Sequence, residues 1–459
     1  MQPAPSLNID LLILGGGPAG LALAIMAARS RLAVTLLERS RYQHPRTGET
    51  FGGELAALLQ EVGLWDAVRN VPRLPFRGQR SSWGEFAQIE RNAMFNPYGE
   101  GWHVDRAAFD QALASAAVQS GVNVLTGCAA TSVEPADAAW SVQLTDGQRL
   151  SARYVVDAGG RDSNAWPAAS RPGQWVRMDR MMAWVARLGA PATKPEPVLQ
   201  IEAVQNGWWY AAPQPDGGLL VSLMTDVDLL AAGPRETLPA AFMAALAEST
   251  HTAALCAGAR LAGEPWAARA DSGFRHPDHG EAWCTIGDAA MACDPLAGDG
   301  VVRAIRSARR AAQRVSQALQ RPIAVTPEVD SGSAYPPLRE AFIEFLHQRA
   351  RHYAREGRFP DSLFWQRRQP LDLRAARIFL DPQSRLVCAN PSPGPQSLAH
   401  VEALLPYSAL RPLLARLREP VVAHEALAAL RAKAPLEDRR LIVAVQELIG
   451  LDVIRVLEN

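Results

Sequence analysis

The sequence predicts an α/β protein, in which a Rossmann-like dinucleotide-binding domain carries an inserted antiparallel-sheet domain and is followed by a helical C-terminal region. Three observations predict this class. A strand, a glycine-rich turn, a helix and a second strand follow one another within the first forty residues. A middle segment, from about residue 172 to 270, shows alternating β patterns. The last sixty residues place Leu and Ala at helical spacing.

The N-terminal segment has the order of a βαβ unit. Residues 9–14, Ile-Asp-Leu-Leu-Ile-Leu, form an apolar run typical of a buried parallel strand. Residues 18–30 are rich in Ala and Leu and predict a helix, and residues 32–37 predict the next strand. The sequence Gly-Gly-Gly-Pro-Ala-Gly joins the first strand to the helix. We therefore expect free N–H groups at the start of this helix to face a phosphate.

This turn matches the G-x-G-x-x-G pattern through Gly15, Gly17 and Gly20. Gly15 permits the tight turn, Gly17 lets a pyrophosphate approach the backbone, and Gly20 lets the helix pack on the strand. Glu38 ends the second strand, where an acid that binds a ribose is expected. The alternative is a glycine-rich turn beside a surface Glu. The predicted cofactor contacts of this unit are Gly15, Gly17, Pro18, Ala19, Gly20 and Glu38.

Changes of pattern divide the chain into four segments. Residues 1–170 and 276–325 are expected to form the two parts of the dinucleotide-binding domain. Residues 171–275 are expected to be the substrate-binding β-sheet domain inserted between them, and residues 326–459 a mainly helical C-terminal region. A Pro-rich break at 389–396 precedes the last helices.

The composition excludes several functional classes. The 459-residue chain carries 47 basic and 47 acidic residues, so no net charge draws it to nucleic acid or to an anionic membrane. Its five cysteines are odd in number and show no CxxC spacing, which argues against a disulfide framework or a metal site. No apolar run is long enough for a signal peptide or a membrane span. We therefore expect a cytoplasmic protein with no metal, no nucleic-acid partner and no membrane partner.

Three further segments resemble the FAD-dependent monooxygenase and halogenase superfamily. Residues 102–110 contain Val-Asp-Arg-Ala-Ala-Phe-Asp, and residues 155–163 read Val-Val-Asp-Ala-Gly-Gly-Arg-Asp-Ser. Residues 286–300 contain Gly-Asp-Ala-Ala followed by Asp-Pro-Leu-Ala-Gly-Asp-Gly. The resemblance implies that the dinucleotide is FAD. It also implies that Asp288 accepts hydrogen bonds from the ribityl chain, and that the helix after Gly300 directs its positive end at the flavin ring.

The same resemblance implies further contacts with the FAD. Arg106 is placed near the cofactor, and Gly159 lets the backbone cross close beneath it. Arg46 precedes a Thr-Gly-Glu-Thr sequence similar to a Gly-Glu-Ser/Thr step of the halogenase branch. Arg46 is then a pyrophosphate or flavin contact, or alternatively part of a solvated loop. The predicted FAD contacts beyond the N-terminal unit are Arg39, Arg46, Arg106, Gly159, Asp288, Pro295, Gly298, Gly300 and Val301.

The sequence Gly-Trp-Trp-Tyr-Ala-Ala-Pro resembles the W-x-W-x-I-P motif of flavin halogenases. It matches at Trp208 and Pro213 but departs at Tyr210 and at the Ala before the proline. Halogenases also need a Lys ahead of the substrate domain, whereas the first Lys here is Lys194. Ala297 stands where tryptophan halogenases have a Glu. These departures favour oxygen chemistry over halogenation, and the two tryptophans are alternatively interpreted as packing on opposite faces of a strand.

The combined motifs resemble a narrower group of flavoproteins, which help to make tryptophylquinone cofactors inside partner proteins. One serves lysine and glycine oxidases, and another serves the small subunit of quinohemoprotein amine dehydrogenase. Resemblance to the latter implies a monooxygenase that hydroxylates the indole ring of a partner's Trp residue through a flavin C4a-hydroperoxide. Such an enzyme needs a protein or peptide substrate carrying a Trp, O₂ and an external electron donor for the flavin.

Two alternative functions stay open. One is hydroxylation or halogenation of a free aromatic metabolite, and the other is a non-catalytic FAD-binding maturation factor. The predicted acid–base residues are Glu49 and Asp294, the carboxylates closest in sequence to the flavin-facing motifs. Asp294 could instead cap the turn before Pro295, and His44 and His103 are further candidates. The helical tail from about residue 397 could dock a partner or only cap the flavin domain.

Overall fold

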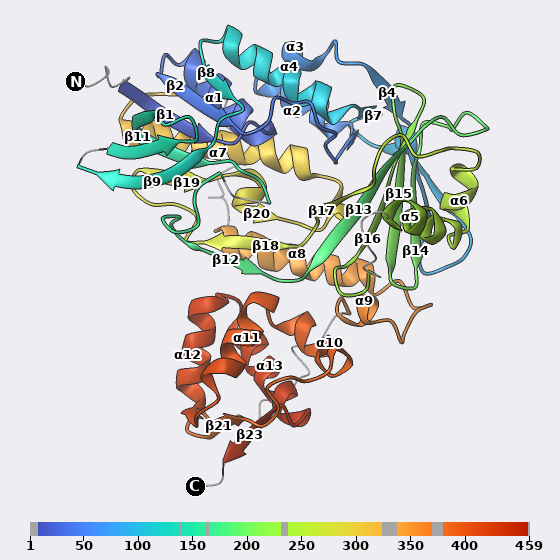
Figure 1. The fold of residues 1–459 in the computed structure, drawn as a ribbon, viewed down its shortest axis with the longest axis vertical. Coiled ribbons are helices and arrows are strands. Elements are labelled where there is room, and N and C mark those ends of the chain that lie inside the picture. The colour runs from blue at the N-terminus through green and yellow to red at the C-terminus, as the bar shows by residue number, and fades with distance from the viewer. Residues whose placement is uncertain are drawn as a thin grey trace.

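The structure, a computed structural model, describes residues 8–137, 139–161, 165–230, 237–323, 337–369 and 380–457. A mainly parallel sheet lies in the upper half of the molecule (Figure 1). Its strands are β1 (Asn8–Leu14), β2 (Val34–Glu38), β8 (Asn123–Thr126), β9 (Ala130–Ala136), β10 (Ala139–Leu144), β11 (Arg149–Asp157) and β19 (Trp283–Thr285). The strand order is β8-β2-β1-β11-β10-β9, with β19 also paired to β11. Only β9 and β10 run antiparallel to their neighbours within this sheet.

Three helices pack against this sheet: α1 (Pro18–Arg29), α4 (Arg106–Gln119) and α7 (Gly300–Leu319). α1 is buried along most of its length, which explains its Ala- and Leu-rich sequence. α7 is amphipathic: Val301, Ile305, Ala308, Ala312 and Val315 recur at spacings of three and four residues and are all buried. The predicted βαβ unit and the helix after Gly300 are therefore confirmed.

A second, seven-stranded sheet lies beside the first one (Figure 1). Its strands are β5 (Gly78–Ser82), β6 (Ile89–Asn92), β13 (Met181–Leu188), β14 (Leu199–Val204), β15 (Gly207–Pro213), β16 (Leu219–Asp226) and β17 (Trp266–Arg269). Their order is β17-β13-β16-β15-β14-β5-β6, and all pairs are antiparallel except β14 with β5. Trp208 and Trp209 on β15 are both buried, and they join different apolar clusters on the two faces of the sheet. This arrangement agrees with the interpretation that one ring packs on each face.

Short elements connect the two large sheets. One is a three-stranded sheet of β3 (Thr50–Phe51), β7 (Gly101–Val104) and β4 (Arg73–Phe76), and α2 (Glu54–Glu61) and α3 (Trp65–Val68) lie between β3 and β4 in the chain. Another consists of β12 (Gln174–Arg177), β18 (Gly273–His276) and β20 (Met291–Ala292). α6 (His251–Leu255) contacts β14 and β15, and Phe242 of α5 (Leu238–Ala247) packs against Trp209 on the same face of the sheet.

The C-terminal region has two parts that lie in different places. α8 (Leu338–Tyr353) and α9 (Leu363–Gln366) pack under the two sheets, and the ring of Phe342 packs at a tilt against Phe274 of β18, with their centroids 4.8 Å apart. A lower lobe follows in red and orange in Figure 1. It contains α10 (Pro395–Leu404), α11 (Tyr407–Arg416), α12 (Ala423–Lys433), α13 (Asp438–Gly450) and a small sheet of β21 (Arg385–Cys388), β22 (Val421–Val422) and β23 (Ile454–Leu457).

The predicted α/β class, with a Rossmann-like domain, an inserted antiparallel sheet and C-terminal helices, is confirmed. One difference is that β5 and β6 join the second sheet from a part of the chain about a hundred residues before the predicted insertion. Local periodicity misses them because β5 is held by parallel pairing with the distant β14. The division of the chain into separate domains stays a prediction.

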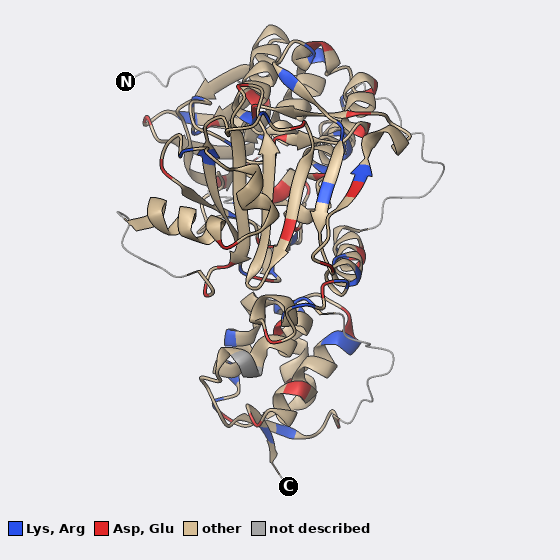
Figure 2. Cartoon of the chain, turned by 90° about the vertical axis from the view of Figure 1, so that its right-hand side faces the viewer, with Lys and Arg blue, Asp and Glu red and all other residues tan. Residues whose placement is uncertain are grey.

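Charged residues of both signs are interspersed over the molecule (Figure 2). Many of them pair with each other, and several of these pairs are buried where α9 meets the second sheet. No helix of the described residues combines the length and the apolar character needed to cross a membrane.

Candidate active site and cofactor groove

One large cavity, of about 1190 Å³, extends between the two main sheets. All but one of the predicted FAD contacts line it, and both predicted acid–base residues, Glu49 and Asp294, line it as well. The exception is Gly20, where a Cβ atom would lie 2.1 Å from the carbonyl oxygen of Gly15. That close approach agrees with the predicted role of Gly20 in packing the helix on the strand.

The start of α1 has the features of a phosphate-binding site. The helix begins without a side-chain cap, so its first N–H groups are not satisfied by a capping residue. A Cβ atom at Gly17 would meet nothing within 4 Å, which leaves open space above the helix N-terminus. Gly15 has a φ of +115°, and a Cβ atom there would lie 2.4 Å from the carbonyl oxygen of Ala158. The residues present therefore fit a dinucleotide.

Glu38 ends β2, as the sequence predicts, and its side chain reaches the glycine turn, while its contact with a ribose stays a prediction. Its carboxylate accepts a hydrogen bond of 2.8 Å from the backbone N–H of Gly16 and one of 2.5 Å from the hydroxyl of Ser40. The hydroxyl of Tyr42 donates to the carbonyl oxygen of Gly16 at 3.0 Å, which fixes the other side of the turn. Burial, followed by the charge of Glu38, raises the pKa of Tyr42, so this hydroxyl keeps its proton and its donor role.

Arg46 and Arg106 line the cavity, but both guanidinium groups are also engaged by the protein. Arg46 pairs with Asp110 at 2.7 Å and with Glu38 at 3.2 Å. Arg106 donates to the carbonyl oxygens of Thr47 and Gly48 and pairs with Asp110 at 3.3 Å. Both arginines thus tie the loop before Glu49 to α4. Their direct contact with FAD stays a prediction, as does that of Arg39.

Residues from the second part of the predicted dinucleotide-binding domain, 276–325, form the other end of the groove. Asp288, in η3 (Gly287–Ala289), pairs with Arg161 at 3.0 Å. Arg161 also donates to the carbonyl oxygens of Asp271 and Cys293, so it connects both sheets to this loop. The loop continues through η4 (Pro295–Ala297) to α7, which begins at Gly300 without a side-chain cap. Its positive end therefore lies on the cavity, as predicted for the flavin end.

Asp294 lies at the base of this loop and is 1% exposed. One carboxylate oxygen accepts from the backbone N–H of Leu296 at 3.0 Å, which confirms the turn-capping alternative. The other oxygen accepts from the hydroxyl of Tyr353 at 2.8 Å, and that hydroxyl accepts from the indole N–H of Trp208 at 3.0 Å. Burial raises the pKa of Asp294. Asp294 thus joins the flavin-side loop to α8 and to β15.

Glu49 also lines the cavity and is 1% exposed. It hydrogen-bonds Tyr210, whose hydroxyl donates to the Thr50 hydroxyl at 2.6 Å. Burial raises the pKa of Glu49, and the hydrogen bond from Tyr210 partly offsets this rise. The second carboxyl oxygen, Oε1, has no hydrogen-bond partner among the described residues. A buried carboxyl group with a raised pKa and a spare polar atom on a cavity wall suits proton delivery to a bound group.

His103 completes this chain, because its Nδ1 lies 2.9 Å from the Thr50 hydroxyl oxygen. The side chain is fully buried, and burial lowers the pKa of His103 to about 4. The imidazole is therefore neutral near pH 7. His103 does not line the cavity, whereas His44 does.

The depressed pKa of His103 predicts a pH-dependent stability. The unfolded chain protonates this group near its ordinary pKa of 6.5, and the folded chain near 4. Its contribution to stability is therefore fully present above pH 6.5 and is lost as the pH falls towards 4. Between pH 7 and pH 5 we expect a loss of about 2 kcal/mol from this group. Urea unfolding of the wild type and of His103→Asn at the two pH values checks this. The variant should lose less unfolding free energy between pH 7 and pH 5, because Asn does not titrate. If the variant lost as much unfolding free energy as the wild type, the assignment of this pH dependence to His103 would be contradicted.

Sequence reasoning missed the partners that hold the two carboxylates. Tyr210 is noted in the sequence only as a departure from a halogenase motif, yet its hydroxyl lies between Glu49 and Thr50. Tyr353 comes from α8, and no signal near it indicates a contact with Asp294. Such contacts depend on how α8 packs under the two sheets, which local sequence patterns do not encode.

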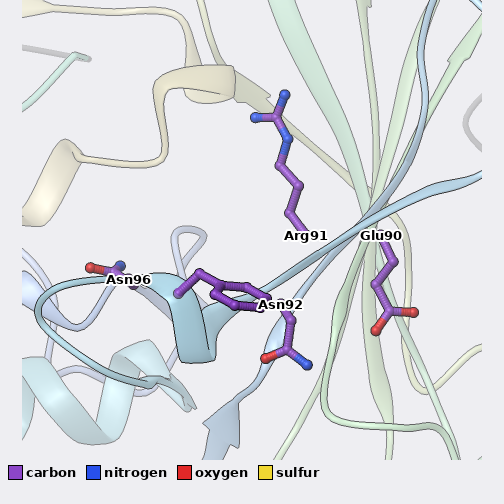
Figure 3. A pocket seen from close by; sticks show the side chains of 5 residues that line it. Glu90, Arg91, Asn92 and Asn96 are labelled. Atoms are coloured by element: carbon purple, nitrogen blue, oxygen red, sulfur yellow. The ribbon is translucent and has the colours of Figure 1, made fainter.

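A separate surface depression of about 580 Å³ lies on β6 and the following η1 (Ala93–Phe95). Its lining residues are Glu90, Arg91, Asn92, Phe95 and Asn96 (Figure 3). None of the predicted site residues belongs to it. Among the residues that the structure describes, no cluster of His, Cys, Asp and Glu could hold a metal ion.

The fold and the groove together define a flavoprotein oxidoreductase. Over residues 60–283 the chain matches the family of FAD dependent oxidoreductases. It is 28% identical to the putative FAD-dependent oxidoreductase LodB of Marinomonas mediterranea, over 79% of this chain and 97% of that protein. The chain is thus an FAD-dependent oxidoreductase with monooxygenase and halogenase relatives, and FAD as its cofactor is confirmed.

Two solved structures share the fold. The peptidyl tryptophan dihydroxylase QhpG, essential for tryptophylquinone cofactor biogenesis, superposes with a TM-score of 0.60 at 24% identity, over 83% of this chain and 84% of that chain. The flavin-dependent halogenase CmlS superposes with a TM-score of 0.67 at 18% identity, over 98% of this chain and 96% of that chain. At these identities the likeness establishes the architecture alone.

Proposed function

We propose that the chain is a flavin-dependent monooxygenase that hydroxylates the indole ring of a Trp residue in a partner protein, during biogenesis of a quinone cofactor. One observation carries this proposal. A single large cavity joins the predicted FAD contacts to a region between Glu49 and Asp294, two buried carboxyl groups whose pKa values are raised. The likeness to QhpG, a peptidyl tryptophan dihydroxylase, supports the same class of substrate.

Reduced FAD, when bound, supplies the electrons that activate O₂. The chain's own part is to exclude water, orient the indole and deliver a proton. Apolar side chains from the second sheet and from β4 line the cavity: Phe76, Leu199, Ile201, Trp208 and Met224. They favour an aromatic ring over water. Glu49 lines the cavity with a raised pKa, which favours proton delivery, and Tyr210 and Thr50 fix the orientation of its carboxyl group.

The cavity lining also favours oxygen chemistry over halogenation. None of the described residues that line the cavity is a lysine. Halogenases of the resembled superfamily need such a lysine, and the arginines on this wall cannot release a proton at neutral pH to replace it. Because some relatives are halogenases, the experiment must distinguish hydroxylation from halogenation.

The test is mass spectrometry of Trp-containing peptides and free aromatic compounds after incubation with the FAD-loaded, reduced enzyme, O₂ and halide. The proposal predicts a gain of oxygen on the indole of a peptide Trp. Incorporation of chlorine or bromine would contradict it and favour the halogenase alternative. Oxygen on a free metabolite alone would assign a small-molecule hydroxylase. A reduced flavin that yields no product with any of these compounds would favour a non-catalytic maturation factor.

Glu49→Gln is expected to lower product formation about a hundredfold, because the amide cannot deliver a proton. Its FAD content should equal that of the wild type, and Glu90→Gln, on an exposed strand, serves as a matched control. Asp294→Asn keeps the cap on Leu296 and tests the second carboxyl in the same way. Full product formation by both variants, with normal FAD content, would remove the acid–base assignment.

A further inference from the structure

Arg303 lies in the first turn of α7, and its side chain lines the large cavity. Its Nε donates to the Oδ1 of Asp299 at 2.8 Å. Its Nη1 is buried and has no hydrogen-bond partner among the described residues, although the side chain as a whole is 23% exposed. A guanidinium group carries only donors, so this N–H group requires an acceptor that the described part of the chain does not supply.

The charge of Arg303 narrows the chemistry of that acceptor. Buried polar groups in folded proteins nearly always have a partner, and an exception indicates a ligand, an ion or a bound water. Burial lowers the pKa of Arg303, but the charges of nearby groups, among them Asp299 and Asp288, more than offset this and raise it. The guanidinium group therefore stays positively charged, and an acceptor that carries negative charge binds it most strongly.

The position of Arg303 in the groove indicates which end of the cofactor it faces. The pyrophosphate is expected at the start of α1, whereas Arg303 lies on α7, next to the loop along which the flavin ring is predicted to lie. Cβ atoms at Gly298 and Gly300 would meet nothing within 4 Å, so the start of α7 has open space around it. The uncapped start of α7 and the guanidinium group of Arg303 both favour negative charge in this space.

We propose that Nη1 of Arg303 donates to the flavin ring of bound FAD, and that its positive charge favours the reduced ring as an anion. Two electrons and one proton leave the reduced ring with one negative charge, and a second proton neutralises it. A nearby cation favours the anion, as it does for a carboxyl group. Arg303 thereby makes the cofactor easier for the external donor to reduce. The inference rests on FAD as the cofactor and does not depend on the proposed substrate.

Three variants separate the charge of Arg303 from its shape and from the net charge of the helix. Arg303→Gln removes the charge and keeps a good helix former. Arg303→Lys keeps the charge but loses the planar guanidinium group. Arg306→Gln is the matched control, because it removes the same charge from the same helix. The side chain of Arg306 is 46% exposed and is not among the residues that line the cavity.

The reduction potential of the bound FAD is measured in each FAD-loaded variant by equilibration with a redox dye, without substrate or O₂. We expect Arg303→Gln to weaken the binding of reduced FAD about tenfold relative to oxidised FAD, which lowers the potential by about 30 mV for a two-electron couple. Arg303→Lys should lie closer to the wild type than Arg303→Gln does, because it keeps the charge. Arg306→Gln should have the wild-type potential.

Protonation of the reduced ring gives a second measurement that a merely structural role would not change. The absorbance of the reduced, FAD-loaded protein is followed as the pH is lowered. Arg303→Gln should take up the second proton about one pH unit higher than the wild type, because the anion loses the same tenfold preference. Arg306→Gln should titrate like the wild type.

A substitution of opposite sign keeps the proposal testable if Arg303→Gln does not fold. Asp299→Asn keeps an oxygen acceptor for Nε of Arg303 and removes its counter-charge, at a side chain that is 37% exposed. The potential should then rise. Wild-type potential and titration in a folded Arg303→Gln, or an unchanged potential in Asp299→Asn, would overturn the proposal and leave a bound water as the partner of Nη1. Because no substrate is present, these results are separate from the test of hydroxylation.

Discussion

Gly17→Val is expected to abolish FAD binding while leaving the chain folded. The backbone at Gly17 has a φ of −83°, which any L-residue adopts, and a Cβ atom there would meet nothing within 4 Å. The new side chain would fill the open space at the N-terminus of α1, where the pyrophosphate is expected. We expect the affinity for FAD to fall at least about a hundredfold, or ~2.7 kcal/mol. Absorbance of the purified protein and titration of the apoprotein measure this.

Gly357→Val is the matched control, because that glycine also has open space around it and does not line the cavity. It should keep the FAD content of the wild type, and both variants should keep the wild-type unfolding midpoint. Gly15 is unsuitable for this comparison, because its φ of +115° and its contact with Ala158 predict a folding defect. Normal FAD binding by Gly17→Val would contradict the placement of the pyrophosphate.

Asp226→Asn is expected to destabilise the chain by about 3–5 kcal/mol, because it removes the carboxylate that pairs with the buried Arg368. Asp226 ends β16 and accepts from Arg368 at 2.6 Å and from Arg367 at 2.9 Å. The side chains of Asp226 and Arg368 are each 1% exposed. Burial raises the pKa of Asp226, but the charges of Arg368 and Arg367 hold it below the usual value. The pair joins the second sheet to the segment that follows α9.

Urea unfolding at pH 7 measures this loss. Asp216→Asn provides the control, since Asp216 pairs with Arg187 at the surface and is 58% exposed. Exposed ion pairs contribute about 0–1 kcal/mol, so the control should unfold close to the wild type. Equal stability of the two variants would show that the buried network does not hold α9 on the sheet.

The sequence predicts those parts of the fold that depend on local patterns. The strand–turn–helix around Gly15 and the amphipathic helix after Gly300 are recognisable because periodicity and glycine spacing are local properties. The place of β5 in the second sheet is not recognisable, because it depends on parallel pairing with β14 across a long stretch of chain. The position of α8 under both sheets depends in the same way on contacts between distant segments.

The residues of the candidate site divide in the same way, into those that local motifs indicate and those that depend on contacts between distant segments. The cofactor residues form motifs, so the sequence indicates them directly, and the structure brings them to one groove. Glu49 and Asp294 are predicted only from their closeness to those motifs. What makes them chemically useful is burial and hydroxyl partners from remote elements, namely Tyr210 and Tyr353. Such environments set a carboxyl pKa, and no sequence spacing encodes them.

The central claim is that FAD lies stretched along the groove between the two sheets. A crystal structure of the FAD-loaded chain tests it most directly. We predict the pyrophosphate above Gly17 at the start of α1, and the flavin ring beside the loop from Asp294 to Gly300 with Glu49 on the cavity wall. A flavin ring bound outside this cavity, or a groove that accepts only a nicotinamide, would contradict the account.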